Sequence, residues 1–375
     1  MEKTAKIIIG IIVIAAVAYG VWYAASKPKT PASTEAIKIG LSVPLTGDAA
    51  SYGQTALAGA TLAVKEINDK GGIKGRKIEL VPEDDKCSPE GVTAINKLVN
   101  VDKVTAILGP MCSGVANAGL PVAQSASIPS LIVASAPGIT NIGDYIFRVY
   151  PSDDFQGSVG AEFIRKQLKK EKAAVIYVKN AWGEAIAKVF AEKFKELGGQ
   201  VVYEGGILQT ATDLKTEIAK VKESGADSLY MPVYPDNTAI AFKQAKEAGL
   251  NLPIVGSDSF ENEEVFNNSY AEGVYYAAGK VNLTEGLKAK INSLPGFEKL
   301  QVSIWSPIGY DTIKIIATAI EKVGTDRAKL RDAIAKTSYK GISYPLIEFN
   351  SNRELKDPLS VVKVIKNKTA VEYSQ

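Results

Sequence analysis

Two serines stand where the chain leaves predicted strands, in positions that suit the binding of a negatively charged group. Ser113 follows the predicted strand 104–108 and begins a helix, and Ser135 follows the predicted strand 130–133 at another helix start. A helix N-terminus offers free N–H groups and the positive end of the helix dipole, so a serine there can belong to an anion site or can simply cap its helix. Where neighbouring strand ends meet, the two hydroxyls can together bind one carboxylate.

The second half of the chain offers the opposite charge in the same kind of position. Asp258 and Tyr234 each follow a predicted strand. Asp258 is expected to receive an ammonium group, with helix capping as the alternative interpretation. Tyr52 and Trp182 lie near loop ends and are candidates for an apolar wall, although aromatic residues in such places more often only pack.

The composition removes most other chemistry. The 375 residues contain no histidine and only two cysteines, and their formal net charge is +3 at pH 7. The lack of histidine rules out histidine-dependent triads and metal sites, and two cysteines are too few for zinc ribbons or iron–sulfur clusters. No phosphate-binding glycine loop, dinucleotide fingerprint or G-x-S-x-G nucleophile motif occurs. The composition still allows an enzyme, although the usual catalytic groups are missing. We expect no cofactor, no metal and no nucleic-acid partner.

Strands and helices that alternate along the chain must position these residues. From residue 37 onward, short apolar runs alternate with amphipathic segments, which predicts parallel sheets covered by helices on both faces. The expected fold is two doubly wound α/β lobes, in which ligands bind beyond the carboxyl ends of the strands. The expected strands are 37–43, 77–81, 104–108, 130–133, 147–150, 173–178, 200–207, 228–232, 252–255, 346–349 and 359–365. The expected helices are 89–99, 155–168, 184–197, 213–224 and 238–248, with others beginning near residues 56, 113 and 306.

The N-terminal segment indicates a location outside the cytoplasm. Residues 7–25 carry no charge and, at about 1.5 Å per residue, are long enough to span a membrane as a helix. Two interpretations stay open: an uncleaved signal anchor over residues 1–26, or a signal peptide cleaved near Ala16-Val17-Ala18. Residues 27–36, rich in Pro, Ser, Thr and Lys, are expected to form a linker. The rest of the chain is then expected outside the cell membrane and tethered to it, or secreted or periplasmic if the segment is cleaved.

The two cysteines would share that compartment. Cys87 and Cys112 make an even number outside the cytosol, which favours one disulfide. Two buried free thiols are the alternative, because free cysteine is often buried.

Several short motifs, taken together, suggest a family. They are P-L-T-G at 44–47, Y-G at 52–53, G-G-I-K-G at 71–75, E-D-D-K-C-S-P at 83–89, G-P-M-C-S at 109–113, A-S-A-P at 134–137 and G-S-D at 256–258. In this order the chain resembles the branched-chain amino-acid-binding proteins (leucine/isoleucine/valine-binding proteins) of ABC importers, which have the type I periplasmic-binding fold. The resemblance covers roughly residues 36–370.

The resemblance implies a two-lobed clamp whose chain crosses between the lobes three times, so that each lobe is discontinuous. The crossings are expected near 150–153, 278–282 and 342–345. The first lobe would comprise residues 37–151 and 282–343, and the second lobe residues 152–281 and 344–375.

The resemblance also implies a disulfide between the two cysteines and an amino-acid site between the lobes. The carboxylate-binding hydroxyls fall on Ser113 and Ser135, with the backbone at Val133 contributing. The ammonium-binding acid falls on Asp258, where leucine-type proteins carry glutamate. The pocket-lining positions fall on Tyr52, Trp182, Tyr234 and Trp305.

The implied function is that of an extracytoplasmic solute-binding protein. It would capture a small amino acid, branched-chain or otherwise apolar, and deliver it as a monomer to the permease and ATPase subunits of an ABC importer. The shorter acid at Asp258 and the larger ring at Trp182 leave amides and other small zwitterions open as ligands. The alternatives are an amino-acid or amide sensor that uses the same clamp without transport, and a secreted hydrolase or transferase, which the missing histidine disfavours.

Overall fold

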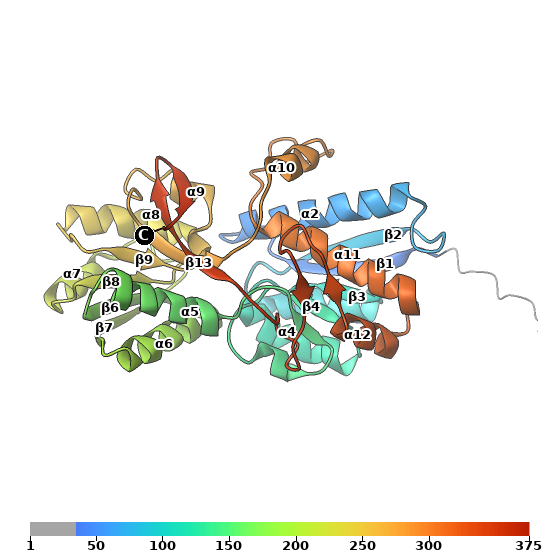
Figure 1. Ribbon diagram of the computed structural model, residues 1–375, viewed down its shortest axis with the longest axis horizontal. Coiled ribbons are helices and arrows are strands. Elements are labelled where there is room, and N and C mark those ends of the chain that lie inside the picture. The colour runs from blue at the N-terminus through green and yellow to red at the C-terminus, as the bar shows by residue number, and fades with distance from the viewer. Residues whose placement is uncertain (1–34, 375) are drawn as a thin grey trace, which may run out of the picture. The chain divides into compact units, whose positions relative to one another are not determined.

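The computed structural model describes residues 35–374, and its strands form two main sheets flanked by helices (Figure 1). The predicted α/β fold with two parallel-sheet lobes is confirmed. The predicted N-terminal anchor or signal segment, residues 1–26, lies outside the described residues, as does nearly all of the predicted linker. Within residues 35–374, no helix combines the length and apolar character that crossing a membrane requires.

The first lobe contains a five-stranded parallel sheet in the order β2-β1-β3-β4-β5. All seven residues of β1 except Lys38 are buried, because helices cover the sheet on both faces. Apolar runs without clear alternation are the sequence signature of such strands. The strands are β1 (Ile37–Val43), β2 (Ile78–Asp84), β3 (Ala106–Leu108), β4 (Ser130–Ile132) and β5 (Ile146–Arg148).

A helix from late in the sequence packs against the first helix of this lobe. A Cβ atom added at Gly59 would lie 1.9 Å from the carbonyl oxygen of Ser306, and one at Gly309 would lie 2.2 Å from that of Ala56. Only glycine permits so close an approach of two helix backbones. The helices of this lobe are α2 (Ala50–Asp69), α3 (Val92–Asn96), α4 (Ser113–Ser125), α10 (Glu285–Asn292), α11 (Trp305–Val323) and α12 (Arg327–Ala335).

The second lobe contains a seven-stranded sheet in the order β14-β13-β10-β9-β8-β6-β7. Its first five strands along the chain are parallel, whereas β13 and β14 form an antiparallel hairpin at one edge. The strands are β6 (Lys172–Val178), β7 (Gln200–Ile207), β8 (Ser228–Met231), β9 (Ile254–Gly256), β10 (Tyr275–Gly279), β13 (Ser360–Lys366) and β14 (Thr369–Glu372). The helices are α5 (Asp153–Glu162), α6 (Ala181–Glu196), α7 (Lys215–Glu223), α8 (Pro235–Glu247) and α9 (Glu263–Phe266).

The chain passes between the two sheets three times. The first two passages lie between β5 and α5 and between β10 and α10. After α12, the small sheet of β11 (Ser338–Tyr339) and β12 (Ile347–Glu348) precedes a segment that reaches Glu354, whose carboxylate pairs with the buried Arg148 at 2.7 Å. The third passage follows this segment and leads to β13.

Most of the predicted elements occur, with shifted ends. β1 and β7 have the predicted bounds, and α11 begins one residue before the predicted start, whereas α2 begins six residues before residue 56. Six of the helices and strands named above were not predicted: β10, β11, β14, α9, α10 and α12. β14 and α12 are short and β14 is largely exposed, so neither presents a strong apolar pattern.

Candidate ligand-binding site

All eight side chains and backbone positions proposed for ligand binding line one cavity of about 50 Å³. The first lobe contributes residues that follow β3 and β4 and the N-terminal parts of α2 and α11, and the second lobe contributes residues that follow β6, β8 and β9. The carboxyl ends of parallel strands thus face a common space, as in other open α/β sheets. The lining residues are Tyr52, Met111, Cys112, Ser113, Val133, Ser135, Trp182, Tyr234, Asp258, Ser259 and Trp305.

Ser113 is the first residue of α4 and does not cap that helix. The N-cap position belongs to Cys112, which makes no side-chain capping bond. The Oγ atom of Ser113 instead accepts a hydrogen bond from the backbone N–H of Ala136 at 3.1 Å. Its hydroxyl proton is therefore still available for donation to an anion at the N-terminal end of α4.

Ser135 uses its hydroxyl proton differently from what the sequence suggested. Its Oγ donates to Oδ2 of Asp153 at 3.0 Å, and the backbone N–H of Asp153 donates to the Ser135 carbonyl at 2.8 Å. Because a hydroxyl carries one proton and two lone pairs, Ser135 in this arrangement faces the cavity as an acceptor. An acceptor suits an ammonium better than a carboxylate.

A buried arginine that the sequence analysis did not single out holds the loop around Ser135. The side chain of Arg148 is fully buried and donates to the carbonyl oxygens of Ala134 and Ala136. Its Nε donates to Glu354 at 2.7 Å, so the charge is paired. Arg148 ends β5, and an arginine at the end of an apolar strand is the signal that points to such a role.

Asp258 brings a buried negative charge from the second lobe. Asp258 is 6% exposed. It is the first residue of a short helix whose N-cap is Ser257, so Asp258 does not itself cap that helix. Nε2 of Gln156 donates to its Oδ2 at 3.3 Å. Burial raises the pKa of Asp258 to about 6, and the hydrogen bonds from Gln156 and Tyr150 oppose that rise.

Asp153 is a second buried carboxyl beside the first. Nε2 of Gln156 also donates to its Oδ1 at 3.3 Å, so a single amide bridges Asp153 and Asp258. Burial, followed by the charge of Asp258, raises the pKa of Asp153 well above its usual range, while Ser135 and Arg148 act in the opposite direction. Two carboxyl groups in a site of low polarity are stabilised by an added cation.

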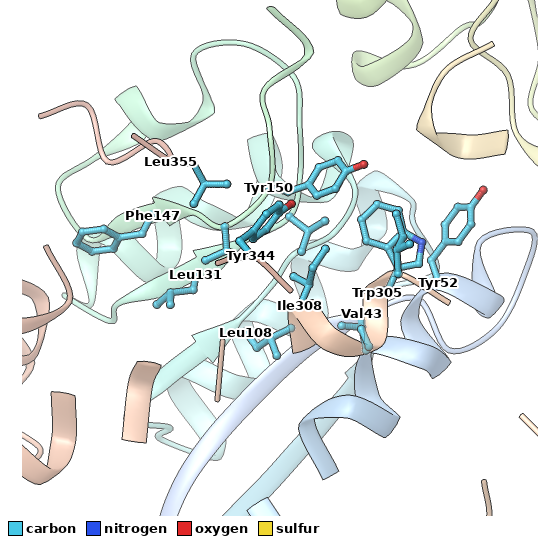
Figure 2. Packing of buried hydrophobic residues seen from close by; sticks show 14 of the residues in the cluster. Val43, Tyr52, Leu108, Leu131, Phe147, Tyr150, Trp305, Ile308, Tyr344 and Leu355 are labelled. Carbon is cyan, nitrogen blue, oxygen red and sulfur yellow. The ribbon is translucent and has the colours of Figure 1, made fainter. Parts of the chain in front are cut away.

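Aromatic rings enclose the cavity from both lobes. Trp182 and Tyr234 stack with ring centroids 5.1 Å apart, and Tyr52 packs against Trp305 at 5.7 Å. Figure 2 shows Tyr52, Trp305 and Tyr150 next to one another above the core of the first lobe. The Tyr52 hydroxyl donates to the carbonyl of Ser259 at 2.8 Å, which joins the two lobes directly.

The predicted disulfide is confirmed, and the alternative of two free thiols is excluded. Cys87 and Cys112 are bonded, with their Cα atoms 5.3 Å apart. The bond fixes the loop after β2 to the residue that precedes Ser113. Sγ of Cys87 also lies 3.6 Å from the Tyr234 hydroxyl of the other lobe.

Two larger cavities flank the small one. A cavity of about 780 Å³ shares Tyr52 with it, and a cavity of about 610 Å³ shares Cys112, Trp182 and Tyr234. Neither contains Asp258 or the two serines. Within residues 35–374, no group of three or more Asp, Glu or Cys side chains is placed to hold a metal ion.

Comparison with known proteins identifies the family. The periplasmic binding protein family matches residues 36–369. A leucine-, isoleucine-, valine-, threonine- and alanine-binding protein of Pseudomonas aeruginosa is 30% identical over 315 residues, covering 82% of this chain and 84% of that protein.

Two solved structures have a similar fold. A leucine-binding protein of Thermotoga maritima has a TM-score of 0.82 at 24% identity and covers 90% of this chain and 98% of its own. The substrate-binding protein of a branched-chain amino acid transporter of Streptococcus pneumoniae, determined with isoleucine, has a TM-score of 0.79 at 26% identity and covers 90% of this chain and 100% of its own. The chain therefore belongs to the periplasmic binding protein family, a family of binding proteins rather than enzymes.

Proposed function

We propose that this protein is the extracytoplasmic solute-binding protein of an ABC importer and that it captures a small amino acid between its two lobes. The observation that carries the proposal is the cavity in which Ser113 of the first lobe and the buried Asp258 of the second lobe both take part. These groups suit the two charged ends of an α-amino acid. The relatives from P. aeruginosa and S. pneumoniae, which are named for binding or transporting amino acids, support the same ligand class.

The ligand carboxylate lies at the first lobe in this proposal. It accepts the hydroxyl proton of Ser113 at the N-terminal end of α4, where the helix dipole favours negative charge. The backbone at Val133 adds a further contact from the end of β4. Charge-assisted hydrogen bonds of this kind are stronger than neutral ones.

The ligand ammonium lies between the lobes. It donates to Asp258 and to the Oγ lone pairs of Ser135, whose proton is engaged by Asp153. Tyr234, Trp182, Tyr52 and Trp305 form the surrounding wall and exclude water, which strengthens each polar contact. Asp153 is a positioning residue here, because it orients the Ser135 hydroxyl and adds negative charge behind it.

Closure of the two lobes completes the site. Several hydrogen bonds join the lobes away from Asp258 and the two serines. Among them, Tyr52 donates to the carbonyl of Ser259 at 2.8 Å, Asn262 to Ser51 at 3.0 Å, and Gln209 to Asp48 at 3.2 Å. Such bonds form only when the lobes approach, as expected for hinge closure around a ligand.

We infer three hinge segments for this closure. They are residues 149–152, 280–284 and 355–359, which connect the lobes between their last and first regular elements. The first lobe then comprises residues 37–151 and 282–354, and the second lobe comprises residues 152–281 and 355–374, with the last boundary later than the sequence suggested.

Delivery to a membrane permease fits the N-terminal segment. We propose that residues 1–26 anchor the protein in the cell membrane, or are removed as a signal peptide, and that residues 27–36 link them to the binding domain. The partners are then the permease and ATPase subunits of the importer, and the binding domain acts as a monomer. The relatives named for transport favour this role over that of a sensor.

The experiment is a thermal-shift screen of the full chain in mild detergent against the twenty amino acids and their amides, followed by calorimetry of those that stabilise it. At least one amino acid is expected to raise the melting temperature, and Asp258→Ala is expected to abolish its binding. Asp69→Ala, at an exposed position on α2, is the matched control. The proposal fails if no amino acid binds, or if Asp258→Ala binds as tightly as the unchanged chain.

A further inference from the structure

One hydrogen-bond donor in the cavity wall has no acceptor. Nε1 of Trp305 is fully buried and makes no hydrogen bond within the part of the chain that the structure describes, and the residue as a whole is 5% exposed. Of the residues in that part with a buried, unpaired side-chain nitrogen or oxygen, Trp305 is the one that lines the cavity. An indole nitrogen can only donate, and a buried donor without an acceptor is costly.

The Trp305 ring is held where it is. Trp305 is the first residue of α11, and its ring packs against two tyrosine rings. Its ring centroid lies 5.7 Å from that of Tyr52 and 4.9 Å from that of Tyr150. The helix itself is fixed by the close approach of Gly309 to α2. Figure 2 shows the indole nitrogen on the side of the ring that faces Tyr52, another residue of the cavity wall. The ring therefore has little freedom to seek an acceptor elsewhere.

The other polar side chains of the cavity already have partners. The Tyr52 hydroxyl donates to the Ser259 carbonyl, the Ser259 hydroxyl donates to the Val233 carbonyl at 2.7 Å, and the Tyr234 hydroxyl accepts from Asn180 at 3.4 Å. The hydroxyl proton of Ser113 also has no acceptor, but the proposed function assigns it to the ligand carboxylate. The unmatched donor at Trp305 thus distinguishes this site from a wall that is merely apolar.

The cavity is small, and its volume of about 50 Å³ is the space open to the centres of water-sized spheres. A leucine side chain has four carbon atoms beyond Cα, whereas serine and threonine have two and three heavy atoms. The smaller side chains therefore require the least widening of the cavity.

We propose that the preferred ligand is a small α-amino acid whose side chain carries a hydroxyl on Cβ, such as threonine or serine, and that this oxygen accepts the Nε1–H of Trp305. The inference rests on the proposed function and names the ligand within the amino-acid class. The ligand ammonium and carboxylate keep the partners described above. Trp305 selects the side chain by donating a hydrogen bond to its hydroxyl oxygen.

Threonine and valine test this directly, because they have nearly the same shape and differ by a hydroxyl in place of a methyl group. Calorimetry of the full chain is expected to give at least about tenfold tighter binding for threonine, since valine leaves the indole N–H unpaired. In Trp305→Phe, which keeps a ring and removes the donor, the threonine-to-valine ratio is expected to fall to about one. Tyr270→Phe, a change of one aromatic residue at an exposed position that does not line the cavity, is the control and is expected to keep the preference for threonine.

The possible outcomes separate the two proposals. Equal or tighter binding of valine by the unchanged chain overturns this inference and leaves the proposed function intact. The inference is also overturned if Trp305→Phe lowers the affinities for threonine and valine by the same factor, because the indole then binds the carboxylate that both ligands share. If no amino acid binds, the proposed function fails as well. If Trp305→Phe does not fold, serine against 2-aminobutyrate on the unchanged chain gives a second hydroxyl-to-methyl comparison that decides the matter.

Discussion

Replacing Asp258 by asparagine is expected to weaken ligand binding and, at the same time, to stabilise the ligand-free fold. The carboxyl is buried, and burial raises its pKa to about 6, so the folded protein holds the proton more tightly than the unfolded chain does. For an acid with a raised pKa, the unfavourable contribution to folding appears as the pH rises through the unfolded value of about 4 toward 6 and is fully present above that. Asparagine has a similar shape and carries no charge at any pH.

The magnitudes follow from the same pKa. The pKa of Asp258 rises from the reference value of 3.8 to about 6. Because each pKa unit corresponds to about 1.36 kcal/mol, the charged carboxyl destabilises the fold by about 3 kcal/mol at pH 7. The unchanged carboxylate is expected to contribute about 2–5 kcal/mol to binding an ammonium, the usual cost of removing one partner from a buried charge pair. With a pKa near 6, about nine-tenths of Asp258 is charged at pH 7 and about one-tenth at pH 5. Ligand affinity of the unchanged chain should therefore fall about tenfold between these pH values.

Two measurements test this reasoning together. Calorimetry at pH 5, 6 and 7 should show affinity rising with pH for the unchanged chain, and a weaker dependence for Asp258→Asn, in which Asp153 is the remaining buried acid. Facing Asp258 are Tyr150, Asp153, Glu261 and the hydroxyls of Tyr52 and Tyr234, and the tyrosines stay neutral throughout this range because burial raises the pKa of Tyr52, Tyr150 and Tyr234. Urea unfolding without ligand at pH 7 should show Asp258→Asn to be the more stable protein. A less stable asparagine variant would show that the charge is already compensated, and the reasoning would be refuted.

Three further predictions concern other parts of the site. Ser113→Ala should weaken amino-acid binding by about tenfold or more in calorimetry, because a charge-assisted hydrogen bond is lost, whereas Ser125→Ala at the exposed end of the same helix should leave binding unchanged. Asn262→Ala removes a hydrogen bond between the lobes and should weaken binding about two- to tenfold without touching the ligand; unchanged affinity would mean that this contact does not favour closure. Reduction of the Cys87–Cys112 disulfide should lower the free energy of unfolding by about 3 kcal/mol in urea titrations with and without reductant.

The bounds of an element could be predicted well from the sequence where its residues clearly favour one type of secondary structure. β1 and β7 are continuous apolar or β-rich runs with turn residues on either side, and their predicted bounds match the structure. β10 was missed because its sequence, Tyr-Tyr-Ala-Ala-Gly, contains small residues that favour no single class. The antiparallel hairpin of β13 and β14 was not predicted as a pair because strand pairing depends on contacts between distant residues.

The site was predictable to the extent that it lies at strand ends. Ser113, Ser135 and Asp258 could be selected because each follows an apolar run, and the three line one cavity. The partners of these residues were not predictable in the same way. Asp153 and Gln156 lie on α5, which the sequence shows only as a helix, and their position between Ser135 and Asp258 depends on how the two lobes meet.

That dependence explains why neither lobe is expected to hold a ligand alone. The first lobe supplies the helix N-terminus and the hydroxyl of Ser113, but its own buried cation, Arg148, is paired with Glu354 and turned toward backbone carbonyls. The second lobe supplies Asp258 and Asp153, two acids that share one amide and are both disfavoured as anions by burial. In the proposed complex, an amino acid joins these halves, because its ammonium stabilises the charges of the second lobe while its carboxylate meets the helix end of the first. Binding and closure are then expected to be one event, driven by the charges of the second lobe and the helix dipole of the first.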